Sequence, residues 1–327
     1  MATIGLDVGG TKVLGVVLDD DDQVVAEHRI PTPRGKDAVL GAIVEVARYL
    51  LDERGGPVTG IGAGVPGLVD AAGVMRFGPN LPGVVDMDVR GTLVSTFGVP
   101  VRVGNDATCA GWGERSIGAA RGSDHVLLVT LGTGIGGGLV SHGTLVQGAN
   151  GFAGEIGHMV VDPTGPPCPC GKRGCWERYA SGSGLGRLAR DAAMAGQAWR
   201  LTELAGGDPE AVKGEHVTIA AAEGDPDAAR ILAEFAWWLA LGLVNLTYIF
   251  DPECFVLGGG LIAAGDVLLV PASKAFGELL AGNEHRPHVR LVPAALGERA
   301  GAIGAALLAR EPGIPAPSEK FPSVNAR

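Results

Sequence analysis

Three cysteines and a histidine in the middle of the chain have the residue types and spacing of a metal site. Cys168, Cys170 and Cys175 fall within eight positions, and His158 lies ten residues upstream. Three thiolates and one imidazole supply the four tetrahedral ligands of a structural zinc ion. The other interpretation is three free thiols, but crowded thiols oxidise readily unless a metal binds them. We therefore expect a zinc-binding loop.

Two carboxylates stand next to this loop. Glu155 precedes His158 by three residues, and Glu177 follows Cys175 by two. A zinc ion with four protein ligands does no Lewis-acid chemistry, but it can fix the direction of neighbouring side chains. Carboxylates held in this way suit a ligand with many hydroxyl groups, because each oxygen accepts a hydrogen bond. Taken singly, each glutamate could equally be an exposed surface charge.

Glycine-rich turns follow three apolar segments, at Gly9–Gly10, Gly132–Gly138 and Gly258–Gly260. Glycine allows successive backbone N–H groups to point into one concavity, which can hold phosphate oxygens. Thr11 and Thr133 add hydroxyl donors to two of these turns. Any one of them could be a plain hairpin turn, but three turns at matching strand ends favour phosphate binding.

The first turn carries further groups suited to a nucleotide. Lys12 adds a cation, and Asp7, at the end of the first apolar segment, could hold Mg²⁺ directly or through water. The sequence contains no Walker A loop, because no Gly-Lys pair is followed by Ser or Thr. The segment Gly132–Gly137 satisfies the dinucleotide pattern G-x-G-x-x-G, but a returning strand follows where that site needs a helix.

Asp106 stands where a strand gives way to a helix. We expect a strand at Pro100–Val103 and a helix from Asp106 to Ile117, with Asp106 as its N-cap. The helix dipole would keep this carboxylate ionised and ready to accept a proton. A plain N-cap aspartate explains the local sequence equally well.

The elements that position these groups follow a repeated order. Strands are expected at Thr3–Asp7 and Lys12–Leu18 around the first glycine turn, and at His125–Leu131 and Leu139–Ser141 around the second. Both halves thus open with a strand, a glycine turn and an antiparallel strand. This repeat predicts two α/β domains that face each other across a cleft, with coincidence among the 54 glycines as the alternative.

The remaining patterns alternate between strands and helices. Further strands are expected at Gln23–Ile30, Thr59–Gly64, Cys254–Leu257 and Val289–Val292, and helices at Asp37–Glu53, Val89–Phe97, Gly184–Met194, Val217–Glu223, Asp227–Ile249 and Gly301–Arg310. Cys109 and Cys254 lie outside the cysteine loop, and we expect both to be buried as small apolar residues.

Length and composition restrict the class of function. A chain of 327 residues suggests two domains. A net charge of −10 disfavours nucleic acids and anionic membranes as partners. The N-terminus lacks the basic and apolar segments of a leader, and the apolar stretch 235–250 is short for a membrane span. We therefore expect a cytoplasmic protein with no membrane and no nucleic-acid partner.

Together these motifs resemble the ROK family of bacterial sugar kinases and repressors, and most of all its actinobacterial ATP-dependent glucokinases. The resemblance runs from Ile4 to about Arg310. Its motifs are Asp7–Lys12, Gly62–Gly67, Asn80, Asn105–Ala107, Leu131–Gly137, Glu155–His158, Cys168–Glu177 and Gly258–Gly260. The resemblance implies an α/β protein with the two-lobed actin-like (ribonuclease H-like) ATPase fold and a zinc-binding loop.

The resemblance also implies how the chain divides into lobes. The N-terminal lobe would comprise residues 1–107, joined by the C-terminal helix at about 301–311. The C-terminal lobe, with the zinc loop, would comprise residues 108–300. Residues 312–327 are rich in proline and serine, and we expect them to form a mobile tail.

The family's activity implies roles for individual residues. ATP, with Mg²⁺, would phosphorylate the 6-hydroxyl of glucose, and Asp106 would act as the general base. The implied sugar ligands are Gly67, Asn80, Asn105, Glu155, His158 and Glu177. The implied nucleotide contacts are Asp7, Gly9, Gly10, Thr11, Lys12, Thr133, Gly134, Gly258 and Gly259. The structural zinc would be bound by His158, Cys168, Cys170 and Cys175, so that His158 serves both the metal and the sugar.

Related activities remain as alternatives. Within the family, kinases for N-acetylglucosamine, N-acetylmannosamine and fructose share the same motifs. A sugar-responsive regulatory protein is the alternative from another class, although the family's repressors carry a helix-turn-helix before the first strand. The resemblance further implies a homo-oligomer, either a dimer or a tetramer.

Overall fold

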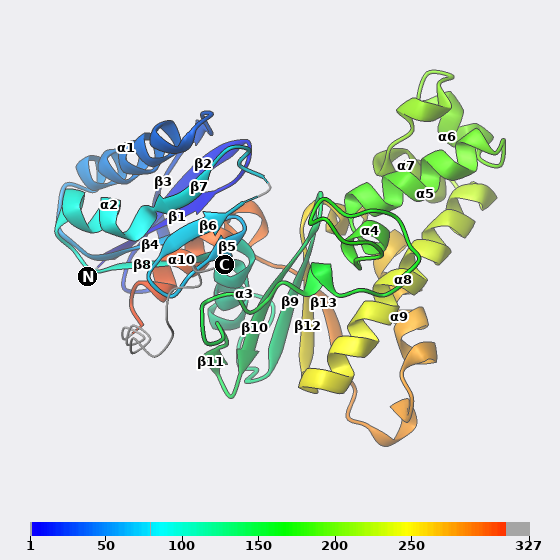
Figure 1. Ribbon diagram of the computed structural model, residues 1–327. Coiled ribbons are helices and arrows are strands. Elements are labelled where there is room, and N and C mark those ends of the chain that lie inside the picture. Colours follow the sequence, from blue (N-terminus) through cyan, green and yellow to red (C-terminus); the bar gives the residue numbers. More distant parts are fainter. Residues whose placement is uncertain (1, 79, 312–327) are drawn as a thin grey trace, which may run out of the picture.

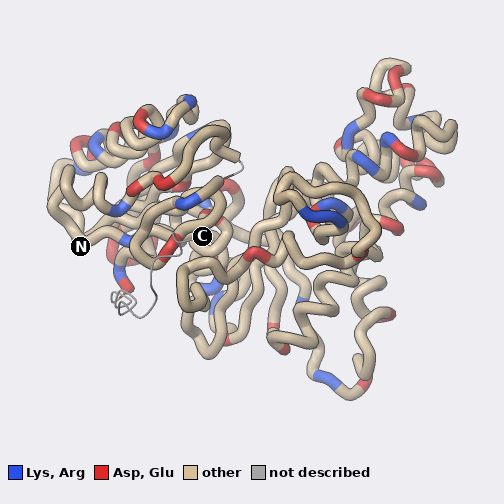
Figure 2. Tube along the Cα trace, in the orientation of Figure 1, with Lys and Arg blue, Asp and Glu red and all other residues tan. Residues whose placement is uncertain are grey.

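The computed structural model describes residues 2–78 and 80–311, which form two lobes, each built around a five-stranded sheet (Figure 1). Charged residues of both signs are spread over the outer helices of both lobes (Figure 2). The expected tail at 312–327 lies outside the described residues.

The two sheets have the same strand order and the same strand directions. The first has the order β3 (Val24–Pro31), β2 (Lys12–Leu18), β1 (Ala2–Val8), β4 (Val58–Val65), β8 (Val101–Asn105). The second has the order β11 (Thr144–Leu145), β10 (Ile135–Ser141), β9 (Val126–Leu131), β12 (Cys254–Gly258), β13 (Arg290–Pro293). In each sheet the first three strands pair antiparallel and the last three pair parallel. The repeat predicted from the glycine turns is therefore present in the topology.

Helix α1 (Lys36–Arg54) covers one face of the first sheet, in contact with β2 and β3. The residues whose helical spacing predicts it, Val39, Ile43, Val46 and Leu50, are all buried. Helix α2 (Val89–Phe97) begins after Asp88, whose carboxylate accepts the N–H of Gly91. A small sheet of β5 (Leu68–Val69), β6 (Val74–Phe77) and β7 (Val85–Asp88) has no counterpart in the sequence predictions.

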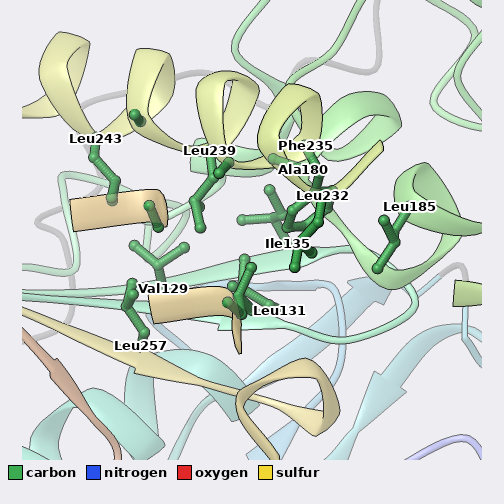
Figure 3. Close-up of a cluster of buried hydrophobic side chains, with 14 of the residues drawn as sticks. Val129, Leu131, Ile135, Ala180, Leu185, Leu232, Phe235, Leu239, Leu243 and Leu257 are labelled. Atoms are coloured by element: carbon green, nitrogen blue, oxygen red, sulfur yellow. The ribbon is translucent and has the colours of Figure 1, made fainter. Parts of the chain in front are cut away.

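The largest apolar core lies in the C-terminal lobe, between the second sheet and the long helix α8 (Pro226–Phe250). Leu239 and Leu243 of α8 point toward Val129 and Leu257 of the sheet (Figure 3). Among the described helices, α8 alone has the length and apolar character of a membrane span, and most of it is buried in the protein. The other α-helices of this lobe are α4 (Glu177–Ala180), α5 (Gly182–Met194), α6 (Trp199–Leu204), α7 (Gly214–Ala222) and α9 (Asp266–Leu279). Short 3-10 turns lie at η1 (Ile156–His158), η2 (Pro209–Ala211), η3 (Gly260–Ala264), η4 (Asn283–His285) and η5 (Gly297–Arg299).

Two helices, α3 (Asp106–Ser116) and α10 (Ala300–Leu308), pack against each other between the sheets. Their backbones come unusually close. A Cβ atom on Gly304 of α10 would lie 1.7 Å from the carbonyl oxygen of Cys109 in α3. On its other side α10 meets the first sheet, where a Cβ on Gly62 would lie 1.7 Å from the carbonyl oxygen of Ala305. Only glycine permits backbones to approach to such distances.

Helix α3 meets the second sheet in the same manner. A Cβ on Gly138 of β10 would lie 2.7 Å from the carbonyl oxygen of Ala107. The first sheet, α10, α3 and the second sheet therefore form four backbone layers, joined at glycines. Cys109 is fully buried in this stack and Cys254 is fully buried in β12, as predicted.

Several predicted boundaries were wrong; the helix expected at Val217–Glu223, for example, is α7 at Gly214–Ala222. Strand β10 begins at Ile135, and Gly136–Gly138 pair with β9 instead of forming a loop. Glycines are tolerated inside this strand because other backbone segments pack on it; a Cβ on Gly137 would lie 2.5 Å from the carbonyl oxygen of Gly154. Helix α10 covers Ala300–Leu308, so its start and end each lie earlier than the predicted range of 301–310.

We predict that Gly304→Ala destabilises the protein by about 3 kcal/mol or more, because the methyl group collides with a backbone carbonyl that cannot move alone. The matched control is Gly41→Ala in α1, where nothing lies within 4 Å of an added Cβ. That change should stabilise by about 0.5–1 kcal/mol through helix propensity. Urea unfolding of both variants tests this, and a Gly304→Ala midpoint at or above the wild-type value would contradict it.

Candidate active site

A cleft of about 710 Å³ lies between the lobes and draws its walls from both sheets. Asp7 from β1 and Asp106 from the start of α3 line it, together with the third glycine turn, Gly258–Gly260. Because β1, β4 and β8 run parallel, their carboxyl ends meet at one edge of the first sheet, which brings the two aspartates together. The structure thus unites Asp7, Gly258 and Gly259 with the predicted catalytic residue.

Asp7 and Thr130 hold the same place in the two sheets. Each is the second-last residue of its strand, and each pairs with a residue of the antiparallel neighbour, Leu14 for Asp7 and Gly136 for Thr130. Both line the cleft. The hydroxyl of Thr130 accepts the N–H of Gly136 at 3.0 Å.

The two aspartates shape the electrostatics of the cleft. Burial, reinforced by the negative charge of Asp106 and opposed by Lys12, raises the pKa of Asp7 to about 7. Burial also raises the pKa of Asp106, while hydrogen bonds from backbone N–H groups and from the Asn105 side chain lower it. A carboxylate with a raised pKa is a better proton acceptor than an ordinary one.

The predicted role of Asp106 as N-cap was wrong. The N-cap is Asn105, whose Oδ1 accepts the N–H of Thr108 at 3.1 Å, and Asp106 is the first residue inside α3. Its Oδ1 accepts the N–H of Ala107 at 2.8 Å. The pKa of Asp106 is raised overall, because the desolvation cost of burial exceeds the stabilisation from these donors.

The first glycine turn is a tight hairpin at the edge of the cleft. The N–H of Gly9 donates to the carbonyl of Lys12 at 2.8 Å, and the Thr32 hydroxyl donates to the Gly9 carbonyl at 2.7 Å. Gly10 and Thr11 are exposed at its tip. The Lys12 ammonium forms an ion pair with Glu298, which lines the cleft. Sequence reasoning missed Glu298, although it follows a predicted strand and a glycine, as the groups of the first turn do.

The second and third glycine turns lie against each other. Gly259 has φ +85°, and a Cβ there would lie 2.6 Å from the backbone of Leu131, directly before the second turn. In that turn the N–H of Gly132 donates to the carbonyl of Gly134 at 3.1 Å, and Thr133 is exposed. Thr133 and Gly134 are not among the residues that line the cleft itself.

Several predicted sugar ligands gather beside Asp106. The side-chain amide of Asn105 donates to the carbonyl of Gly67 at 3.1 Å, and Gly67 takes φ +86° to make this turn. Asn80 is exposed, and its carbonyl oxygen packs against Gly10, where an added Cβ would lie 2.8 Å away. Asn80 therefore borders the first glycine turn, and no described contact joins it to Asn105.

His158 lies between two carboxylates. Its Nε2 is 3.8 Å from Oε2 of Glu155, and its Nδ1 is 3.7 Å from Oε1 of Glu177. Burial raises the pKa of Glu155; the nearby His158 lowers it, and the charges of Asp106 and Glu177 raise it. The predicted base and these three predicted sugar ligands therefore share one electrostatic environment.

The four predicted metal ligands lie together. The donor atoms of His158, Cys168, Cys170 and Cys175 are all within 4.8 Å of one another. The Cys168 sulfur is 3.9 Å from Nδ1 of His158, and the sulfurs of Cys170 and Cys175 are 3.6 Å apart. Three sulfurs and one imidazole nitrogen this close together fit the closed donor set of structural zinc.

A tryptophan anchors this cysteine loop to the C-terminal lobe. Trp176 is fully buried, and its indole N–H donates to the carbonyl of Trp238 in α8 at 2.8 Å. Its ring occupies the space over Gly242, where a Cβ would lie 2.0 Å from a ring carbon. The next residue, Glu177, therefore has a fixed backbone, with its Oε1 3.0 Å from the Cys168 sulfur.

This chain belongs to the ROK family, whose profile matches residues 3–312. It is 39% identical over 316 residues to the glucokinase of Streptomyces coelicolor, covering 95% of this chain and 98% of that one. It is 35% identical over 311 residues to the glucokinase of Thermotoga maritima, covering 94% and 97%. The solved structure of a ROK family glucokinase from Streptomyces griseus, in complex with glucose and AMPPNP, superposes with a TM-score of 0.82 at 39% identity and covers 95% and 99%. The family and the two-lobed actin-like fold predicted from the sequence are confirmed.

The pKa of Asp7 yields a prediction about stability and pH. The folded-state pKa of about 7 lies above the ordinary value of 3.8, so the contribution of Asp7 to stability is fully present below about pH 4 and is lost as pH rises through 7. Asp7→Asn removes this pH-dependent loss of stability, because asparagine does not ionise. The ligand-free variant should match wild type near pH 4 and exceed it by about 2 kcal/mol at pH 8. Urea unfolding at both pH values checks this, and an equal difference at both would contradict it.

Proposed function

We propose that the protein transfers the γ-phosphoryl group of ATP to the 6-hydroxyl of glucose, with Asp106 as the general base. The observation that carries this proposal is the placement of Asp106, which lines the cleft together with Asp7 and Gly258–Gly260. Its charge also raises the pKa of Glu155, which lies beside His158. The likeness to the Streptomyces griseus glucokinase, whose structure contains glucose and AMPPNP, extends over 95% of the chain and supports both ligands.

In this mechanism the sugar lies against the polar cluster. Carboxylates of Glu155 and Glu177 accept hydrogen bonds from sugar hydroxyls, and Asn105, Asn80 and Gly67 complete the sugar site. Asp106 accepts the proton of the 6-hydroxyl as its oxygen attacks the γ-phosphorus in line. Because its pKa is raised, Asp106 holds that proton more firmly than an ordinary aspartate would.

The triphosphate lies along the glycine turns. Backbone N–H groups of Gly9, Gly10, Gly134, Gly258 and Gly259 are suited to phosphate oxygens. The hydroxyls of Thr11 and Thr133 add donors, and Lys12 adds positive charge. Asp7 fits a role in Mg²⁺ binding, because a buried carboxyl beside a second carboxyl favours a nearby cation. When bound, Mg²⁺ supplies positive charge that offsets the charge on the phosphates.

We further propose that His158, Cys168, Cys170 and Cys175 bind one structural zinc ion. A closed site of this kind supplies folding energy and no catalysis. Its effect on the reaction is indirect, because His158 Nδ1 faces the sulfurs while its Nε2 faces Glu155. Location in the cytoplasm and assembly into dimers or tetramers stay predictions from the sequence.

A coupled assay of ADP release with a panel of sugars tests the proposed substrate. We expect kcat/KM to be highest for glucose, because a pocket fitted to a hydroxyl at C2 excludes an acetamido group. A higher value for N-acetylglucosamine, N-acetylmannosamine or fructose would overturn glucose and leave the kinase mechanism. Glucose binding without ADP release would favour the regulatory alternative.

In the same assay, Asp106→Asn should lower kcat for glucose by about 10² or more while KM for glucose changes little, because proton acceptance alone is removed. The matched control is Asp225→Asn, at the N-cap of α8, where the carboxylate accepts the N–H of Ala228 at 2.8 Å. Asparagine also caps helices well, so this control should keep full activity. Turnover near wild type in the Asp106 variant would exclude it as the base.

For the metal, purified protein should contain about one zinc per chain, and Cys170→Ala should lose it. Activity should fall as well, because His158, Glu155 and Glu177 lose their fixed directions. Cys254→Ala, a buried cysteine outside the cluster, should retain zinc and activity. Metal analysis and the ADP assay give both readouts, and full activity in verified zinc-free protein would refute the positioning role.

A further inference from the structure

Glu114 is a fully buried carboxylate that the mechanism above does not use. It lies in α3 and is 0% exposed. Its Oε2 accepts the N–H of Ala119 at 2.8 Å and the N–H of Ala295 at 3.1 Å, and its Oε1 accepts the N–H of Leu296 at 2.8 Å. Hydrogen bonds to an ionised group are about twice as strong as neutral ones, so this is a firm attachment.

Two of these donors belong to a wall of the proposed nucleotide cleft. Ala295 and Leu296 lie in the segment that joins β13 to α10. The residues on either side of them, Pro293–Ala294 and Gly297–Glu298, line the cleft. Glu114 therefore binds the wall segment at Ala295 and Leu296, between its cleft-lining residues, and does not itself line the cleft.

The same helix carries the proposed general base. Asp106 begins α3, and Glu114 follows eight residues later, about 12 Å along the helix axis. An α-helix packed on both sides at glycines is a rigid spacer between these two residues. The distance from Asp106 to the cleft wall is thereby set through α3 and the carboxylate of Glu114.

We propose that Glu114 is a positioning residue that fixes the nucleotide wall relative to Asp106, so that the bound triphosphate is aligned with the sugar hydroxyl. This inference rests on the proposed binding of ATP in the cleft. If the attachment is loosened, the wall moves away from the nucleotide, while the sugar ligands, which come from other segments, keep their places.

A purely structural role for Glu114 would predict lower stability and nothing more. Glu253 offers a matched control, because its Oε1 also accepts two backbone N–H groups, from Asp124 at 3.0 Å and His125 at 3.1 Å. These donors lie before β9, and neither they nor Glu253 line the cleft. Glu253→Gln therefore neutralises a carboxylate that also accepts backbone N–H groups, at an exposed place remote from the nucleotide.

The test compares Glu114→Gln, Glu114→Asp and Glu253→Gln with wild type, using steady-state kinetics, calorimetric binding of AMPPNP and glucose, and thermal unfolding. In Glu114→Gln an amide N–H₂ must face backbone N–H donors, which loosens the attachment of Ala295 and Leu296. Because the wall then shifts, KM for ATP and Kd for AMPPNP should rise about tenfold. The glucose Kd should stay within about twofold. Glu114→Asp keeps the charge but shortens its reach, so it should show an intermediate effect and serves if the Gln variant does not fold.

Glu253→Gln should leave both nucleotide constants unchanged. Its amide oxygen can still accept both N–H groups, so its unfolding temperature should fall less than that of Glu114→Gln. Unchanged AMPPNP affinity in the Glu114 variants would overturn the inference, as would an equal loss in Glu253→Gln. Absence of AMPPNP binding by wild-type protein would instead overturn the proposed function, and this inference with it.

Discussion

The close contact between α3 and α10 is the constraint on which the rest of the structure depends. At Gly304 and Gly62 the backbones approach to distances that any side chain would prevent, so the two helices and two sheets form one continuous stack. Each of the two cleft carboxylates lies at an end of a layer in this stack, Asp7 near the end of β1 and Asp106 at the start of α3. Their proximity is therefore a result of packing, with no direct attraction required.

That proximity has an energetic cost which function explains. Two buried carboxyls that share a cleft raise each other's proton affinity or demand a cation. The positive charge of Lys12 lowers the pKa of Asp7 in part, but its ammonium also forms an ion pair with Glu298. The proposed binding of a metal–nucleotide complex would supply the positive charge that these two carboxyls favour.

The sequence could predict the parts of the site whose residues lie near one another along the chain. The cysteine loop, the glycine turns and the strand repeat each fall within short segments. The structure brings the four predicted metal ligands together and contains the strand repeat, while the second glycine turn is shorter than predicted. The sequence could not predict the N-cap, because Asn105 and Asp106 are both good caps; in the structure the backbone of Asn105 is extended and the helix begins at Asp106. Glu114 and Glu298 escaped notice because their partners lie far away, 181 and 182 residues for Glu114 and 286 for Glu298. Such pairings arise only once the lobes have folded together.

The equivalent places of Asp7 and Thr130 give the cleft a direction. The two sheets repeat the same strand order and directions, and a cleft lined identically by both would accept an elongated ligand in either of two opposite orientations. Asp7 in the first sheet and the neutral hydroxyl of Thr130 at the equivalent place in the second make the two orientations different. A nucleotide has a charged end and an uncharged end, so only one polarity places its phosphates beside the acid and any cation it holds. Two sheets of the same topology therefore line a cleft whose two ends differ chemically.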